Sequence, residues 1–270
     1  MRVPKPLCVL ALLAAGCGGD YYLTAGDQLA PAGAEGPIVV RLQRSEIWRV
    51  PMPIKKGLIR FDVPQVGDRG AYTDDLGYAG TTLKAPAEPG VYPVGLSHKD
   101  RDGDIVEGEL QLYVWDADRP VVAVDYDSLP ERDSPGADAA WAALRQLSAG
   151  ANLLYVTRRE TDEHEKVHAE LRALTYPDGP VLLWQRERWH IVREGRFRIP
   201  RVVVESRLVS QLAELRAIFP GLDTGVSGTQ LGAKAFLDAG LTCAVVGPVE
   251  TDLPGLVRYA TWADFAAERP

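Results

Sequence analysis

The stretch that most constrains the fold is Val121–Pro130, which reads VVAVDYDSLP. Its unbroken run of apolar, mostly β-branched residues is typical of a central parallel strand, because such a strand is buried on both faces. The run ends at Asp125 and Asp127, and a spacing of two residues puts both carboxylates on the same side of the strand's carboxyl end. Ligands of open α/β sheets bind at that end. The pair is therefore a candidate site, although aspartates also serve simply to end a strand and shape a loop.

The rest of the C-terminal half alternates strands with helices. The apolar patterning predicts strands over residues 153–157, 181–184, 223–226 and 243–246, and helices over residues 134–150, 161–175, 206–218 and 229–239. Repeated strand–helix units predict a parallel sheet with helices on both faces. We therefore expect residues 119–270 to form an α/β domain.

The N-terminal half has a different sequence pattern. Short alternating segments between residues 37 and 118 are separated by turn clusters rich in Gly, Pro and Asp. This pattern predicts an antiparallel β-sandwich of the immunoglobulin-like kind. Residues 17–36 are rich in Gly, Ala and Pro, and we expect them to be a tether. The acidic stretch Asp100–Asp104 resembles a calcium loop, but Ile105 and Gln111 stand where an EF-hand needs Gly and Glu, so we expect a hairpin turn.

Composition narrows the class of protein. The chain has 270 residues, 46% of them apolar, and a formal net charge of -7 at pH 7. This length allows two modest domains with their own cores. An acidic chain is a poor general nucleic-acid binder, because neutralising phosphates requires a basic face. We therefore expect no nucleic-acid partner.

The N-terminus carries an export signal. Arg2 and Lys5 precede a short apolar segment that ends in Leu13-Ala14-Ala15-Gly16-Cys17, the arrangement of a secretory signal peptide. The terminal L-A-A-G-C resembles the lipobox of bacterial lipoproteins. That resemblance implies removal of residues 1–16, acylation of Cys17 and a membrane-anchored location in the cell envelope. Beyond this segment no apolar run approaches the roughly 18 residues that a spanning helix needs.

The C-terminal half resembles a known family through several motifs in order. These are the strand with D-x-D, the strand that ends in Thr157, and the segments Leu154–Arg158, Tyr176–Leu183 and Phe219–Gly221. Together they resemble the haloacid dehalogenase superfamily, in particular its lipin and actin-patch phosphatidate phosphatase branch, in which a β-sandwich often precedes the catalytic domain. The resemblance covers residues 120 to about 246.

The resemblance implies roles for individual residues. Asp125 would be the nucleophile that forms an aspartyl-phosphate, Asp127 the general acid and base, and Thr157 a phosphate ligand, with Mg²⁺ held by the two aspartates. Ser227, which follows the predicted fourth strand and precedes a helix, is a further candidate for binding phosphate, since helix N-termini attract anions. Ser227 and Thr229 would serve equally well as helix caps.

Two parts of the family pattern are missing. Alignment on Phe219-Pro220 places Leu208 where the family has a catalytic Lys, with Arg207 next to it. The family's metal-binding acids after the fourth strand are replaced by Ser227-Gly228-Thr229, and Asp223 precedes that strand. Losing a preorganised charge stabiliser costs about 10² to 10³ in rate. Two hypotheses follow: an impaired Mg²⁺-dependent phosphatase acting on a phosphorylated small molecule or an anionic lipid, or an inactive pseudophosphatase that serves as a binding module.

A literal H-E-x-x-H spans His164–His168, the spacing that places two zinc ligands one helical turn apart with Glu165 as base. A zinc metalloprotease is thus a weaker hypothesis, with Glu187, Glu194 or Glu205 as a third ligand. The motif stands at the start of its helix rather than between apolar turns, which also suits two histidines at the rim of a packed helix.

A basic segment interrupts the second half. Residues 185–201 contain six arginines interleaved with Trp189, His190 and Phe197. Such a patch suits phosphate or anionic headgroups, and a solvated loop with an edge strand is the plainer alternative. Cys243 lies in an apolar strand and is most simply a buried small residue.

Overall fold

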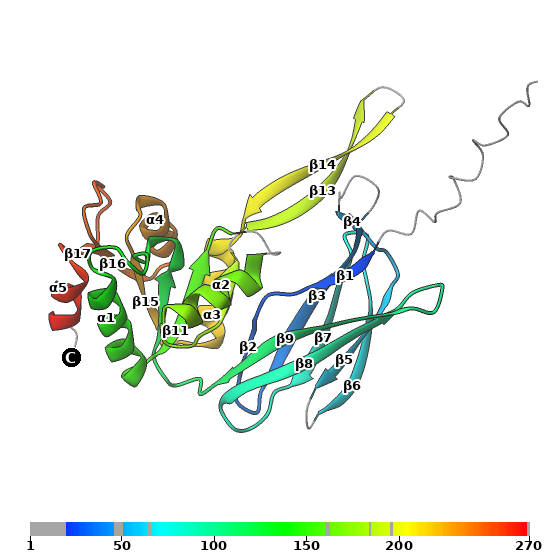
Figure 1. The fold of residues 1–270 in the computed structure, drawn as a ribbon, viewed down its shortest axis with the longest axis horizontal. Coiled ribbons are helices and arrows are strands. Elements are labelled where there is room, and N and C mark those ends of the chain that lie inside the picture. Colours follow the sequence, from blue (N-terminus) through cyan, green and yellow to red (C-terminus); the bar gives the residue numbers. More distant parts are fainter. Residues whose placement is uncertain are drawn as a thin grey trace, which may run out of the picture.

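The computed structural model describes residues 20–45, 51–63, 66–159, 163–183, 185–194 and 197–268. The predicted signal peptide and Cys17 lie outside these residues. The described chain forms a β-sandwich and an α/β half that stand side by side (Figure 1). Among the described helices, none is both long enough and apolar enough to span a membrane.

The N-terminal half is a sandwich of two sheets. One sheet contains β1 (Tyr21–Thr24), β3 (Glu35–Ser45), β4 (Pro51–Pro53) and β7 (Tyr78–Lys84). The other has the order β2 (Gln28–Pro31), β9 (Ile105–Trp115), β8 (Gly90–Lys99), β5 (Leu58–Val63) and β6 (Gly67–Tyr72). Alternate residues of β5, namely Ile59, Phe61 and Val63, are buried between the sheets. This is the period-two burial of a half-exposed strand, and the predicted sandwich is confirmed.

The predicted tether is wrong for the described residues from 21 onward. Residues 21–24 and 28–31 form β1 and β2, and β3 begins at Glu35. The first two strands have four residues each, too few to show a clear alternation, and the turn before β3 uses Gly33 at φ 69°. A Gly- and Ala-rich sequence of this kind reads as a linker even when it folds into edge strands.

The turn at Asp100–Asp104 is a hairpin connection, as predicted. One side-chain oxygen of Asp100 accepts hydrogen bonds from the backbone amides of Asp102, Gly103 and Asp104, at 2.8 to 2.9 Å. This oxygen therefore organises the β8–β9 turn through local backbone contacts, the usual role of Asp in turns.

The C-terminal half is built on a six-stranded parallel sheet. Its order is β12 (Val181–Leu183), β11 (Asn152–Thr157), β10 (Val121–Asp125), β15 (Leu222–Ser227), β16 (Thr242–Val246) and β17 (Leu256–Tyr259). All five residues of β10 are buried. Successive connections run outward in opposite directions from β10 and β15, so the topological switch point lies between these two strands.

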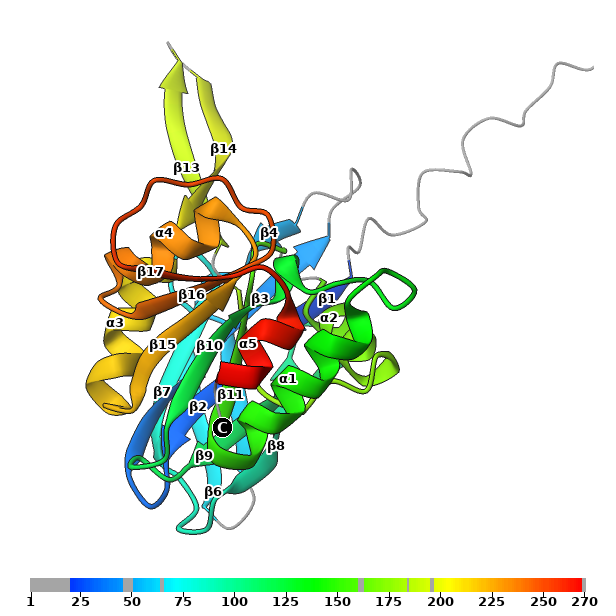
Figure 2. The same cartoon turned by 90° about the vertical axis from the view of Figure 1, so that its left-hand side faces the viewer.

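Helices cover both faces of this sheet. They are α1 (Ala137–Gly150), α2 (His164–Ala173), α3 (Leu208–Ile218), α4 (Gln230–Asp238) and α5 (Trp262–Glu268). Side chains from α1, α2 and α5 share one apolar core with Val122 and Val124, whereas those from α3 and α4 share another with Val121 and Ala123. Figure 2 shows α1 and α5 lying next to each other in front of the sheet. The predicted helices on both faces are present.

Helix α1 starts later than the sequence predicts. Ser134, expected to cap it, donates its hydroxyl to the carbonyl of Glu131 instead, and Gly136 at φ 95° immediately precedes the helix. A left-handed residue cannot belong to an α-helix, so the helical turns begin at Ala137.

The two halves share apolar contacts. Trp115, at the end of the last sandwich strand, packs edge-on against Phe219 with ring centroids 5.8 Å apart. Both belong to the core beneath α3 and α4. The hairpin of β13 (Gln185–Glu194) and β14 (Phe197–Ser206) pairs only with itself and projects from the body (Figure 1). It carries the predicted basic segment, whose side chains lie outside the described part of the structure.

Candidate functional site

The first candidate site lies at the switch point of the parallel sheet. Asp125 ends β10 and Ser227 ends the neighbouring strand β15. Ser227 donates its hydroxyl to Oδ2 of Asp125 at 2.6 Å, and Thr229 donates to the same oxygen at 2.7 Å. Thr229 also caps α4, because its hydroxyl oxygen accepts the amide hydrogen of Gly232. The capping role proposed from the sequence is therefore present.

Asp125 is enclosed by protein. Its exposed fraction is 0%, and its second oxygen, Oδ1, has no hydrogen-bond partner in the described part of the chain. Burial raises the pKa of this carboxyl above its ordinary value, against the opposing effect of the Ser227 and Thr229 hydrogen bonds. Gly232 packs so closely that a Cβ there would lie 2.4 Å from Oδ2 of Asp125. The protein thus walls this carboxylate off with the first turn of α4.

Asp127 belongs to a separate group of contacts. Its Oδ1 accepts the hydroxyl hydrogen of Thr157 at 2.7 Å, and its Oδ2 accepts the backbone amide and the side-chain Nε of Arg158 at 2.7 and 3.1 Å. Thr157 is fully buried. The structure therefore brings Asp127 together with Thr157, and Asp125 together with Ser227.

These contacts fit poorly with the Mg²⁺ site that the family resemblance implies. Mg²⁺ requires six oxygens in a near-ideal octahedron. Both oxygens of Asp127 and one oxygen of Asp125 already accept hydrogen bonds from protein groups. The sequence stretch after β15 adds hydroxyls to Asp125 rather than another carboxylate.

The remaining predicted positions lie away from the carboxylates. Leu208 is 1% exposed in the core beneath α3. Arg207 lines a different cavity, of about 340 Å³, between the sandwich and the α/β half. Asp223 is exposed near the amino end of β15, opposite the end that carries Ser227. Cys243 is fully buried, as its apolar strand indicates.

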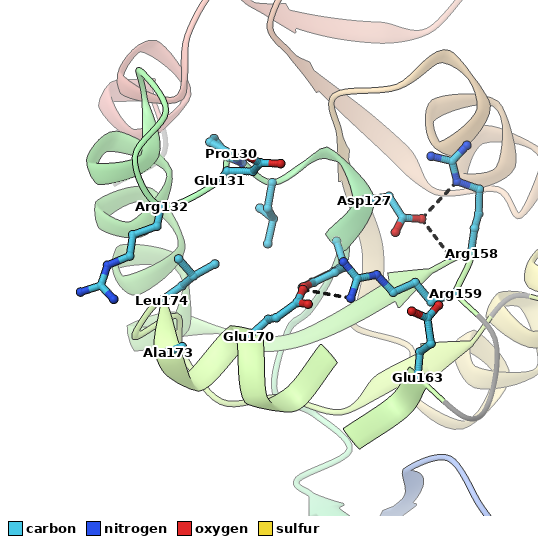
Figure 3. A pocket seen from close by; sticks show the side chains of 12 residues that line it. Asp127, Pro130, Glu131, Arg132, Arg158, Arg159, Glu163, Glu170, Ala173 and Leu174 are labelled. Atoms are coloured by element: carbon cyan, nitrogen blue, oxygen red, sulfur yellow. Dashed lines mark hydrogen bonds and ion pairs between the residues drawn. The ribbon is translucent and has the colours of Figure 1, made fainter. Parts of the chain in front are cut away.

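A larger pocket of about 830 Å³ opens beside Asp127 (Figure 3). Its polar lining contains two ion pairs, Arg158 with Asp127 and Arg159 with Glu170, the latter at 2.9 Å. The Arg159 guanidinium lowers the pKa of the Glu170 carboxyl and lies 5.1 Å from the centre of the Tyr126 ring. The pocket wall is therefore held by charges from the segments that follow β10 and β11 and from α2.

A second cluster of ionisable groups lies where α2 meets the sandwich. His164 and His168, the histidines of the H-E-x-x-H motif, both approach Asp27, which lies between β1 and β2. The ligand atoms of these three residues lie within 4.8 Å of one another. The sequence interpretation missed Asp27, because it lies 137 residues from His164 in a segment read as a tether and no local motif marks it. The glutamates named as third ligands, Glu187, Glu194 and Glu205, lie on β13 and β14, whose side chains are not described.

Comparisons with known proteins do not assign a family. No family model matches the chain, and no curated protein matches it. The solved structures with similarity include the CARDB domain of a Pyrococcus furiosus protein, at 7% identity and a TM-score of 0.22 over 35% of this chain and 89% of that one. CopC from Methylosinus trichosporium has 17% identity and a TM-score of 0.24 over 35% of this chain and 93% of that one. A carbohydrate acetylesterase from Xanthomonas citri has 11% identity and a TM-score of 0.31 over 84% and 60%. At TM-scores this low, the similarities carry no argument about fold or function.

Proposed function

We propose that the α/β half is a phosphatase-like domain of the haloacid dehalogenase kind that lacks turnover and serves as a binding module in the cell envelope. The observation that carries this proposal is the burial of Asp125, whose Oδ2 accepts two hydroxyl groups. A carboxylate nucleophile must reach phosphorus in line with the leaving group. A fully buried carboxylate beneath the first turn of α4 has no room for that approach.

The residues around Asp125 also support a domain without turnover. In an active enzyme of this family, a Lys and further acids would hold the phosphoryl group and the metal. Here the corresponding positions hold Leu208, which is buried in the core, and Ser227, which is bonded to Asp125. These substitutions replace charged partners by hydroxyl groups that bond Oδ2 of Asp125, which orders the centre without supplying charges to a transition state.

The pocket beside Asp127 supports a retained binding role. Its volume of about 830 Å³ suits a small molecule. Arg158 and Arg159 stand at its wall, each paired with one carboxylate, and a guanidinium group has further donors with which it can also bind phosphate. We assign a phosphorylated small molecule or the headgroup of an anionic lipid as the ligand class.

The envelope location rests on the N-terminal signal. The lipobox-like sequence places a lipid anchor at Cys17, a few residues before β1 begins at Tyr21. This short spacing would keep the immunoglobulin-like sandwich close to the membrane surface. The anchored protein would then present its pocket to ligands of the envelope.

Phosphate release tests the proposal. The full chain is incubated with p-nitrophenyl phosphate, or with phosphatidic acid in vesicles, in the presence of Mg²⁺, and is compared with Asp125→Asn. We expect the same background release from both proteins. Asp138→Asn, which changes an exposed acid on α1, is the matched control. Mg²⁺-dependent release that Asp125→Asn abolishes and Asp138→Asn retains would show an active phosphatase and reject the proposal.

A further inference from the structure

Three ionisable side chains meet where α2 contacts the sandwich, and one buried carboxylate oxygen among them has no hydrogen-bond partner in the described residues. Asp27 comes from the connection between β1 and β2, and its side chain is 0% exposed. His164 and His168 are one helical turn apart on α2, with side chains only 11% and 14% exposed. Their rings meet edge to face with centroids 4.8 Å apart. Three groups with metal-binding atoms are therefore nearly buried together at the junction of the two halves.

The hydrogen bonds fix the state of one histidine nitrogen. The backbone amide of Asp27 donates to Nε2 of His164 over a long 3.3 Å, so that nitrogen is an acceptor, and a metal bound there would displace this weak amide contact from its lone pair. Oδ1 of Asp27 lies 3.3 Å from the same nitrogen, is buried, and has no hydrogen-bond partner in the described residues. Two electron-pair donors thus face each other, an arrangement that a cation between them would stabilise.

The other oxygen of Asp27 is already satisfied. Oδ2 accepts the backbone amide of Val181 at 2.6 Å and lies 2.7 Å from Nε2 of His168. The Val181 contact holds the carboxylate in place from the α/β half. Oδ1 is left directed at His164, which is the orientation that a monodentate carboxylate ligand needs.

The spacing agrees with a tetrahedral metal. Zinc binds imidazole nitrogen and carboxylate oxygen at about 2.0 to 2.2 Å, so two ligands of one tetrahedral ion lie roughly 3.3 to 3.5 Å apart. The separation between Oδ1 of Asp27 and Nε2 of His164 is 3.3 Å. His168 completes the set when its ring turns Nε2 from Oδ2 of Asp27 toward the ion, since an imidazole binds a metal through a nitrogen lone pair.

We propose that Asp27, His164 and His168 bind one divalent transition-metal ion of the zinc type, which joins the sandwich to the α/β half. Two ligands come from α2 and one from the sandwich, and a fourth position remains for water. Glu165, the base of a hydrolytic H-E-x-x-H site, is exposed whereas the ligands are nearly buried. Glu165 is therefore not positioned as a base at the ion, whose role in this proposal is to join the two halves. This proposal is independent of the phosphatase-like site.

Metal analysis of the full chain tests the site. Protein stripped with a chelator is loaded with Zn²⁺, desalted and analysed by elemental mass spectrometry, and Co²⁺ serves as a spectroscopic probe of a tetrahedral site. We expect one zinc ion per chain. Asp27→Asn and His168→Gln should each weaken zinc binding by about 100-fold or more, because each removes a ligand. Glu165→Gln changes the same motif at an exposed position and should bind zinc as the wild type does.

Each outcome decides for or against the site. Failure of the wild type to retain stoichiometric zinc overturns the proposal, and so does undiminished binding by Asp27→Asn or a loss of binding in Glu165→Gln. Circular dichroism and gel filtration check that the variants fold. If both ligand variants fail to fold, zinc X-ray absorption on the wild type decides. Two imidazoles with oxygen ligands support the site, and any other ligand set rejects it.

Discussion

Ser227 donates its hydroxyl hydrogen to Oδ2 of Asp125 over 2.6 Å, and the two residues end adjacent strands at the switch point of the sheet. In an enzyme that uses this carboxylate, the same place would receive a substrate. The effect of substituting Asp125 or Ser227 on the free energy of unfolding therefore shows whether this contact stabilises the fold.

Asp125→Asn should stabilise the protein at neutral pH. Burial raises the pKa of Asp125 in the folded state above its ordinary value of 3.8, so the folded protein holds this proton more tightly than the unfolded chain. The stabilisation linked to that proton is fully present below the unfolded pKa and is lost as the pH rises through the folded pKa. The neutral amide avoids the loss, and we expect Asp125→Asn to unfold at a higher urea concentration than the wild type at about pH 7.5.

The same comparison at low pH provides the control. At about pH 2.5, well below the ordinary pKa of 3.8, the carboxyl is protonated in both states, so the advantage of Asp125→Asn should disappear. Urea denaturation at the two pH values measures both free energies of unfolding. A variant that is less stable than the wild type at neutral pH would show that the ionised carboxylate stabilises this centre.

Ser227→Ala should destabilise the protein. It removes one of two hydrogen bonds to a buried carboxylate, a loss that costs about 1 to 3 kcal/mol. Ser210→Ala is the matched control, because Ser210 is exposed on α3 and its hydroxyl donates to the carbonyl of Arg207. We expect that control to change stability by less than about 0.5 kcal/mol. Equal effects of the two substitutions in thermal or chemical denaturation would contradict the network around Asp125.

An element of this fold could be predicted from the sequence when the pattern that specifies it lies within a short stretch of residues. The strand at Val121–Asp125 was predictable, because buried parallel strands are continuous apolar runs. The strand Leu222–Ser227 gives a weaker signal, because Asp, Thr and Gly interrupt its apolar residues. Strand β17 was missed because it is a short edge strand in which only Tyr259 is buried. The pairing of Asp125 with Ser227, rather than with Thr157, depends on how β15 docks beside β10, which no local pattern contains.

The cluster of Asp27, His164 and His168 also could be predicted only in part from the sequence. The two histidines were visible as a motif because they lie on one helix. Asp27 was invisible, since its role arises only when the sandwich packs against α2. Ligand sets assembled across a domain junction leave no spacing in the sequence.

Mg²⁺ should have little effect on stability. A ligand stabilises the folded state by RT ln(1 + [L]/Kd), so a weak ligand contributes little. The contacts of Asp125 and Asp127 leave few oxygens for this ion. Millimolar Mg²⁺ added to chelator-treated protein should shift Tm by less than about 1 °C in a scanning calorimeter. Asp127→Asn should show the same absence of response. A clear rise in Tm that this variant abolishes would establish a magnesium site at the D-x-D pair.

Gly232→Ala should be among the most destabilising single changes in the α/β half. A Cβ at this position would lie 2.4 Å from Oδ2 of Asp125 and 2.5 Å from Oγ of Ser227, well inside contact distance, and both atoms are held by hydrogen bonds. Overpacking of this kind costs about 1 to 3 kcal/mol. Gly150→Ala is the matched control, because Gly150 is also helical and a Cβ there would meet no atom within 4 Å. The control should be neutral or stabilising by up to about 1 kcal/mol, since Ala favours helices over Gly. If both variants unfold at the same urea concentration as the wild type, the close packing of α4 against Asp125 is not a feature of the protein in solution.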